Sequence, residues 1–460
     1  MTLPTTLRWL AFVACLALFM WQPFVTMFDA AERYGYLADI MPSDWLATNL
    51  WLDTTDCALQ RGVWLALCED GKLVPLSERA IADDPGHALL LDLWSLSVGR
   101  RATLPDVARL NTLIDAAGLV GLAGLLFALR AYATAIVLLV LGPPEYLGWM
   151  GTSPHWSFIG VVSLCAVLPI ALIARDRGLL SRRSGAAWIM AGVVLLALAT
   201  LIRESMGLMG FVLSLLAASA LALYPPRTAR RIAGYAVMGV LVLAAFSSAK
   251  WVVMARDATF DMQPAQRLAT HGLSHTLYLG LGTIENKWGI RYDDDYGREV
   301  AQQVDPDIVF CSPEYFRVMW RLYLSRWLDD PVEVMRIYLE KAIYLATTPT
   351  LFPGPPFGVV LLIGLLHLGA ASALGLWRRI GFEQGFVIEI VTVGFIGLFL
   401  AQSMAALPSQ TYAMPVNAFV LVLAGVIVEF VGRALLILFL PRHRGRSPAG
   451  PEGQGLNRGL

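Results

Sequence analysis

The chain has 460 residues, of which 57% are hydrophobic and only 15% carry a charge. Soluble domains carry about 25% charged residues, so this composition favours an integral membrane protein. The formal net charge is +0, which excludes a generally basic surface of the kind that binds nucleic acid. We therefore expect membrane-spanning segments and no nucleic-acid partner.

About ten apolar segments are long enough to cross a bilayer as helices, which takes roughly 20 residues. They lie at 7–28, 112–130, 132–148, 156–174, 186–203, 206–224, 232–251, 356–377, 384–405 and 412–437. The first segment ends without a small-x-small cleavage site, which predicts a retained helix and not a signal peptide. The third is interrupted by Gly142, Pro143 and Pro144, and we expect residues 143–155 to form a loop.

Arginines are distributed unevenly between the two sides of these segments. The ends and short loops on the side of the N-terminus are rich in them: Arg8, Arg130, Arg175, Arg177, Arg182, Arg183, Arg227, Arg230, Arg231, Arg378, Arg379, Arg433, Arg442, Arg444 and Arg446. The short loops on the other side, at 143–155, 203–205 and 406–411, contain only Arg203. Because basic loops stay in the cytoplasm, we expect both termini there, with a multi-pass location in the cell (inner) membrane.

Two long loops, 29–111 and 252–355, then lie on the periplasmic or extracytoplasmic face. Within them, residues 87–100 and 314–346 mix Trp, Leu and Tyr with charges at helical spacing, which is typical of helices along a membrane surface. The predicted fold class is an all-α polytopic membrane protein, with a transmembrane domain over 1–437 and a disordered cytoplasmic tail over 438–460.

The first loop contains two cysteines and two adjacent acids. Cys57 and Cys68 form a disulfide if the loop is outside the cytoplasm, but the sequence leaves the pairing open. Asp83 and Asp84 precede an interfacial helix that begins near His87. One carboxylate is suited to act as a general base on an acceptor hydroxyl, whereas the alternative is a turn with a helix N-cap.

Other polar residues lie at the edges of the apolar segments. Glu145 and Tyr146 fall in the predicted loop 143–155, where the acid is either solvated or faces the same cavity as Asp83. Arg203 interrupts the apolar run between the fifth and sixth segments. It either forms an ion pair within the protein or holds a phosphate, which guanidinium binds in a bidentate manner.

The second loop begins with a dense set of cations, aromatic residues and glycines. Its candidate ligands are Lys250, Arg256, Arg267, His271, His275, Tyr278, Asn286 and Lys287. Such a set suits an anionic head group with a sugar, because cations hold phosphates and aromatic rings stack on sugars. Residues 293–295 are three consecutive aspartates, which either bind a divalent cation or form a solvated turn.

The order of helices and loops resembles the GT-C superfamily of integral-membrane glycosyltransferases, which use polyprenyl-phosphate-linked sugars as donors. Asp83-Asp84-x-x-His87, ahead of an amphipathic helix that ends at Gly99, is similar to the acidic motif in the first loop of that family. Arg203 lies in an outer turn, where members often contact the donor phosphate. The resemblance covers about residues 7–437. In the family the acidic motif lies closer to the first helix, so Asp29, Asp39 and Asp44 are alternatives.

The resemblance implies a role for each candidate residue. Asp83, with Asp84 as runner-up, is the expected general base, and Arg203, Lys250, Arg256 and Arg267 are expected to hold the donor phosphate. The expected substrate-lining residues are His87, Glu145, Tyr146, His271, His275, Tyr278, Asn286 and Lys287. No cofactor is certain and no metal ligand is assigned, although a divalent cation stays an open alternative.

The function implied by the resemblance is transfer of a sugar from a polyprenyl-phosphate donor to an acceptor hydroxyl of a glycan, lipid or protein at the bilayer surface. Competing interpretations are a lipid or glycan transporter, a non-catalytic envelope-assembly subunit and an O-antigen-ligase-like enzyme. A transporter needs polar groups through the bilayer midplane, and the apolar segments contain few of them.

Overall fold

The computed structural model describes residues 21–38, 46–78, 85–150, 159–262, 265–267, 272–350, 354–408 and 414–439, with isolated positions before residue 21. Helices dominate these ranges. The exception is an antiparallel hairpin of β1 (Ala66–Glu69) and β2 (Lys72–Pro75), in which Ala66 pairs with Pro75. The predicted helical class is therefore confirmed apart from this hairpin, which the sequence analysis did not foresee. Most of the predicted tail lies outside the described residues.

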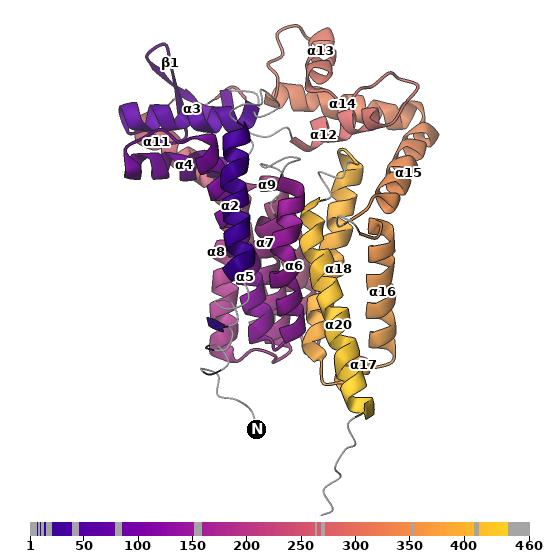
Figure 1. Cartoon of the computed structure of the whole chain (residues 1–460). Helices are drawn as coiled ribbons and strands as arrows, with labels where there is room; N and C mark the ends of the chain where they lie inside the picture. The colour runs from indigo at the N-terminus through magenta and orange to yellow at the C-terminus, as the bar shows by residue number, and fades with distance from the viewer. Residues whose placement is uncertain are drawn as a thin grey trace, which may run out of the picture.

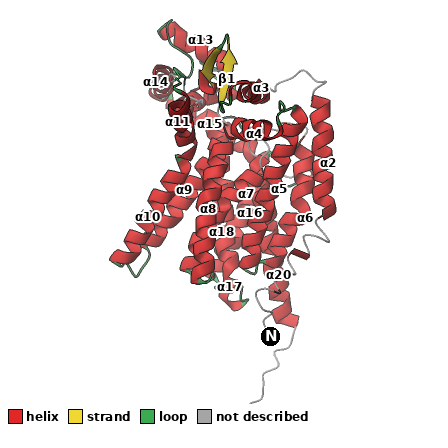
Figure 2. Ribbon diagram, turned by 90° about the vertical axis from the view of Figure 1, so that its left-hand side faces the viewer, coloured by secondary structure: helices red, strands yellow, loops and turns green. Residues whose placement is uncertain are grey.

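Seven described helices are long and apolar enough to cross a membrane. They are α5 (Leu104–Ala128), α7 (Ile159–Asp176), α8 (Arg182–Ile202), α9 (Glu204–Leu223), α10 (Ala229–Phe246), α18 (Glu383–Ala405) and α20 (Asn417–Phe439). Figures 1 and 2 show them in one bundle, with α10 beside α9 in Figure 2 and with α2 (Trp21–Ala38), α6 (Tyr132–Met150) and the shorter apolar helix α16 (Phe357–Ala373) also part of it. These three helices overlap the other three predicted segments, so the total of about ten spans stays a prediction.

Helix α7 lies at the centre of the bundle and packs against α5, α8, α9 and α18. Two glycines allow α5 and α7 to approach closely. A side chain at Gly118 would overlap the backbone of Gly160, and one at Gly160 would overlap the backbone of Asp115. The two helices therefore pack with their backbones in contact.

Helix α6 corrects the prediction of a loop at 143–155, because the helix continues through Pro143 and Pro144 to Met150. Each proline removes a backbone donor. Extensive packing of α6 against α20 and α5 offsets that loss, and tertiary contacts override the local preference. Glu145 and Tyr146 are consequently buried inside the bundle and not solvated at its edge.

The described part of the first loop folds as a small unit at one end of the bundle. It comprises α3 (Leu46–Arg61), the hairpin, the short helix η2 (Leu76–Glu78) and α4 (Pro85–Val98). Cys57 and Cys68 form a disulfide that joins α3 to β1. Asp92 of α4 is fully buried and accepts hydrogen bonds from the Thr54 hydroxyl (2.7 Å) and the Leu65 amide (2.8 Å). These bonds fix α4 against α3.

The second loop begins with α11 (Ser248–Phe260), which belongs structurally to the first loop. Arg256 of α11 is buried, donates to the carbonyl of Leu65 and pairs with Asp257 at 2.6 Å. Arg267 donates to the Glu78 carbonyl at 3.0 Å. The start of the second loop and the first loop are thus held together by side-chain hydrogen bonds.

The remainder of the second loop forms its own core. It contains α12 (Gly272–Gly280), η3 (Leu281–Thr283), α13 (Asp294–Val304), α14 (Pro313–Asp329) and α15 (Pro331–Thr347). The buried Lys341 of α15 donates to the carbonyls of Gly280 and Ala406, at 2.8 Å each, and so links this core to the end of α18. The stretch 314–346, predicted to be amphipathic, forms the two helices α14 and α15.

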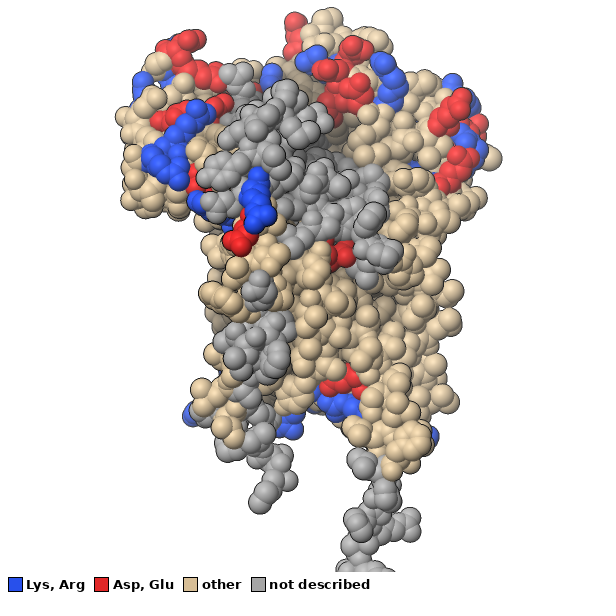
Figure 3. Space-filling view, viewed as in Figure 1, with Lys and Arg blue, Asp and Glu red and all other residues tan. Residues whose placement is uncertain are grey.

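Both loop units lie at the same end of the bundle, opposite α17 (Leu376–Arg379) (Figures 1 and 2). The short helix η4 (Met414–Val416) precedes α20. On the face drawn in Figure 3, charged side chains gather over the loop units and at the opposite end, and few lie on the surface between. We call the two loop units together the loop layer. This arrangement matches a bundle that crosses a membrane with its loop layer on one side.

Candidate active site

The start of α4 packs against the end of α8. Pro85 is the first helical residue of α4, a position where its missing amide hydrogen is not needed. A side chain at Gly86 would come within 2.6 Å of the Leu201 carbonyl oxygen, so α4 sits directly on the backbone of α8. His87 is fully buried, its ring stacks on Trp51 at 4.3 Å, and its Nε2 donates to Asn111 Oδ1 at 2.9 Å.

Arg203 forms the turn between α8 and α9, capping the end of the first and the start of the second. Burial lowers the pKa of His87 to about 4; the positive charge of Arg203 adds to that shift, and the hydrogen bond to Asn111 opposes it. His87 is therefore neutral near pH 7, and Arg203 lies close enough to affect it. Asp83 and Asp84 lie outside the described residues and directly precede Pro85 in the sequence.

We expect Gly86→Val to displace α4 from α8 and to lower stability by about 1 to 3 kcal/mol, the usual effect of overpacking. The buried thiols Cys165 and Cys311 allow a measurement by thiol-reactive dye during heating, in a Cys15→Ser background. Gly234→Val is the matched control, because that helical glycine faces open space. Equal melting temperatures for the two variants would contradict the close approach of α4 to Leu201.

Buried polar groups continue from His87 into the bundle along α5. The hydroxyls of Thr112 and Tyr146 lie 3.0 Å apart, and Asp115 accepts a hydrogen bond from the Gly160 amide. On the neighbouring α20, Asn417 donates to Glu145 at 2.6 Å. Tyr146 and Glu145, predicted to contact substrate, therefore belong to an internal hydrogen-bonded network.

Two atoms of this network have no partner among the described residues. They are Asp115 Oδ2 and Asn417 Oδ1, and both side chains are fully buried. Leaving a buried polar atom unpaired is costly, so such atoms are suited to receive a ligand hydroxyl, water or proton. The sequence analysis missed these residues and Asn111. The available signal was an isolated polar residue within an apolar segment, which in a membrane protein indicates function or a partner.

The second loop holds a separate polar cluster. His275 Nδ1 lies 2.7 Å from the Tyr315 hydroxyl, and its Nε2 lies 3.2 Å from Asp294 Oδ1. Burial raises the pKa of Tyr278 to about 12, with Tyr296 and Arg326 beside it. His275 and Tyr278 thus pack within the core of the second loop. In Figure 1, their helix α12 and the His87 helix α4 lie on opposite sides of the loop layer.

Two other predicted substrate residues stabilise the second loop. Asn286 bonds to both the amide and the carbonyl of Ile290, at 3.0 and 2.9 Å, and so shapes the turn after η3. Lys287 pairs with Asp330 at 2.8 Å at the surface. His271 lies outside the described residues.

The four predicted phosphate ligands occupy different environments. Of these four residues, only Arg203 lies beside the N-terminal end of α4, which follows Asp83 and Asp84 in the sequence. Lys250 is exposed on α11, whereas the guanidinium groups of Arg256 and Arg267 already donate to backbone carbonyls of the first loop. Arg203 is therefore the strongest candidate to bind an anion.

The aspartate run 293–295 does not converge on one point. Asp293 caps α13, Asp294 contacts His275 and Asp295 pairs with Arg298 at 2.8 Å. Within the described ranges, no group of three or more His, Cys, Asp or Glu side chains is arranged to hold a metal ion. The described part of the run therefore gives no support to the divalent-cation alternative.

The described part of the site thus combines an arginine and a neutral imidazole at the loop-bearing end of an apolar bundle. An arginine in this place can hold an anion. Comparison of this chain with family models, curated proteins and solved structures gave no match of any kind.

Proposed function

We propose that the chain is a membrane glycosyltransferase that moves a sugar from a polyprenyl-phosphate donor to an acceptor hydroxyl. The observation that supports this is the packing of α4 on the α8–α9 turn. This packing brings the N-terminal end of α4, which directly follows Asp83 and Asp84 in the sequence, to the turn that carries Arg203. A displacement at a phosphate-linked carbon needs both a base and a cation, and in this proposal Asp83 is the base and Arg203 the cation.

In the proposed mechanism, Asp83 takes the proton from the acceptor hydroxyl, with Asp84 as the alternative base. The resulting oxygen nucleophile attacks the anomeric carbon, and the bond from that carbon to the phosphate oxygen breaks. The lipid phosphate leaves with the bonding electrons, and Arg203 stabilises its growing negative charge. Attack from the face opposite the leaving group inverts the anomeric centre. Neutral His87 holds Asn111 and Trp51 in place without adding charge.

The location of the site suits a lipid-linked donor. It lies at the boundary between the apolar helices and the loop layer, where a phosphate reaches polar groups while its lipid stays in the bilayer. By the distribution of arginines, this boundary is the outer face of the cytoplasmic membrane. The acceptor is a glycan, lipid or protein of the cell envelope. The loop order resembles that of GT-C enzymes, which adds to the proposal.

A second candidate function is a lipid or glycan transporter. The buried polar network of Asp115, Glu145 and Asn417 favours it, because intramembrane polar groups often mark a substrate or proton pathway. The charged side chains, however, are concentrated in the loop layer, which favours a site at the membrane surface over a pathway through the bundle.

The test is to reconstitute the wild-type chain in vesicles with a pool of radiolabelled polyprenyl-phosphate sugars and a membrane extract as acceptor. Release of free polyprenyl phosphate with labelled sugar in the acceptor fraction is the expected result. Vesicles that carry the double variant Asp83→Asn, Asp84→Asn are the matched control. If the donor is unchanged but moves between leaflets, the transporter function replaces the transferase.

A further inference from the structure

Helix α14 has one packed face and one apolar face that nothing in the described residues covers. Its inner face is buried through Tyr315, Met319 and Tyr323. On the other face, Trp320, Leu324 and Leu328 follow one another at four-residue spacing, and Leu328 is 87% exposed. Residues four apart lie on one side of a helix, so these three form a continuous apolar line.

The apolar line continues on α15. Val332, Met335, Leu339 and Ile343 are exposed at helical spacing, while Val334 and Ile337 are buried on the opposite side. A soluble surface rarely presents so long an apolar patch unless something covers it. The two helices are consecutive, so one partner can cover the entire line.

The bilayer is the partner that the neighbouring helix indicates. Helix α16 follows α15 and has 17 residues, which span about 25 Å, less than the roughly 30 Å of a hydrocarbon core. Helix α15 also packs against both α16 and the apolar helix α18, which brings part of it to the level of the bundle. Exposed residues of α16, such as Leu362 and Leu366, extend the apolar surface of α15 towards the centre of the bilayer.

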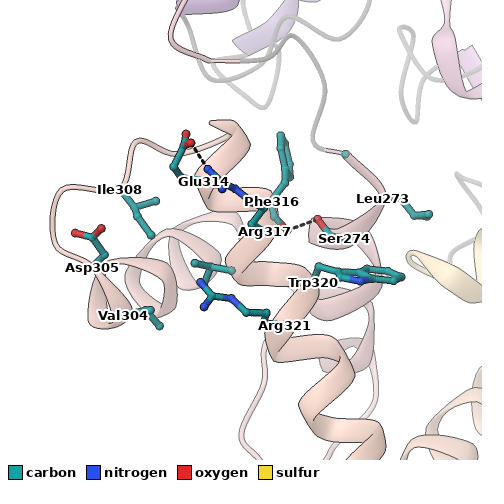
Figure 4. A pocket seen from close by; sticks show the side chains of 12 residues that line it. Leu273, Ser274, Val304, Asp305, Ile308, Glu314, Phe316, Arg317, Trp320 and Arg321 are labelled. Carbon is teal, nitrogen blue, oxygen red and sulfur yellow. Dashed lines mark hydrogen bonds and ion pairs between the residues drawn. The ribbon is translucent and has the colours of Figure 1, made fainter.

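Charge beside the apolar line indicates which part of the lipid is bound. Arg317 and Arg321 lie one turn apart on α14; Arg317 pairs with Glu314, whereas Arg321 has no acidic partner in the described part of the chain. Figure 4 shows Trp320 projecting from α14 towards Leu273, whereas Arg321 projects from the other side of the helix towards Val304. These side chains line a cavity of about 1020 Å³.

We propose that the exposed face of α14 and α15 lies in the headgroup layer of the bilayer and that this cavity holds a phospholipid. Arg321 binds the lipid phosphate, because guanidinium pairs with phosphate in a bidentate manner. The acyl chains lie against Trp320 and Leu324, and indole rings favour this depth of a membrane. An anionic phospholipid is preferred, since it adds a second negative charge. The site does not depend on which reaction the chain performs.

Spin labels test the position of the apolar face. Labels are attached at Leu324→Cys and Leu339→Cys in the full chain, in a background that lacks Cys15, Cys165 and Cys311 and keeps the Cys57–Cys68 disulfide. In nanodiscs of phosphatidylcholine and phosphatidylglycerol, collisions with oxygen should exceed collisions with a water-soluble nickel chelate. A label at Arg298→Cys, exposed on α13, is the control and should show the reverse. Nickel access at positions 324 and 339 equal to that at 298 would overturn the proposal.

Lipid counting tests the phosphate contact. Native mass spectrometry of the chain released from these nanodiscs gives the occupancy of the first bound phosphatidylglycerol relative to phosphatidylcholine. Arg321→Gln should lower this preference about five-fold, the effect of one basic residue near a membrane surface. Arg291→Gln, an exposed arginine elsewhere in the loop layer, is the matched control and should leave the preference unchanged. A wild-type preference in Arg321→Gln would remove Arg321 from the site, even if the spin labels report lipid.

Discussion

Asp83→Asn is expected to lower sugar transfer by about 10²-fold or more, because an amide cannot take the proton of the acceptor hydroxyl. The substitution keeps the size and the hydrogen-bonding capacity of the side chain, so the helix start at Pro85 is retained. The measurement is release of polyprenyl phosphate from a labelled donor pool in membranes, at saturating acceptor. The loss should appear in kcat, since the base acts in the chemical step.

Asp84→Asn is the matched control for this substitution and should lose much less activity. Formation of the Cys57–Cys68 disulfide, seen as a mobility change on reduction, shows that each variant has inserted and folded its first loop. If Asp84→Asn is the inactive variant, Asp84 is the base. Full activity in both variants would mean that neither Asp83 nor Asp84 is the base. The base would then be Asp29, Asp39 or Asp44, and the N-terminal end of α4 would have no part in the mechanism.

Arg203→Gln is expected to reduce kcat by about 10²- to 10³-fold, because it removes the charge that stabilises the departing phosphate. The same substitution should raise the pKa of His87 towards its ordinary value, since the positive charge of Arg203 contributes to keeping it low. Titration of labelled histidine by NMR measures this second effect. If Arg203 served only in packing, a lower kcat and a higher pKa of His87 would not be expected together in the same variant.

Arg203→Lys keeps the charge but loses the bidentate geometry, so its activity should fall between those of the wild type and Arg203→Gln. Arg378→Gln, at the opposite end of the bundle and 86% exposed, should behave as the wild type. An Arg203→Gln variant with unchanged kcat would show that Arg203 has only a structural role in the α8–α9 turn.

The membrane-spanning helices were predictable because bilayer thickness sets the length of an apolar segment. The segments predicted at 186–203 and 384–405 match α8 (Arg182–Ile202) and α18 (Glu383–Ala405) closely. At Pro143 and Pro144 the local signal failed, because these residues predicted a break that the structure does not have. Helix α6 remains helical because its neighbours α5 and α20 hold it, and the sequence does not say which helices are neighbours.

The polar network of the site was not predictable for the same reason. Asn417 and Glu145 are 272 positions apart in the chain and come together only through the packing of α20 on α6. Periodicity identifies the buried face of each helix but not its partner. The position of Arg203 next to the start of α4 likewise depends on tertiary packing. The sequence predicted that Arg203 and the first loop lie on the same side of the membrane, but not that the start of α4 packs beside the turn that carries Arg203.

The attachment of α11 to the first loop has a consequence for how the protein is made. Arg256 reaches back to Leu65, 191 positions earlier, and Arg267 reaches back to Glu78, 189 positions earlier. The first loop is therefore synthesised long before the residues that complete it. At about 5 to 20 residues per second, the delay is on the order of 10 to 40 seconds. During this time the loop exposes surface that α11 will cover, so it is then open to chaperones and proteases.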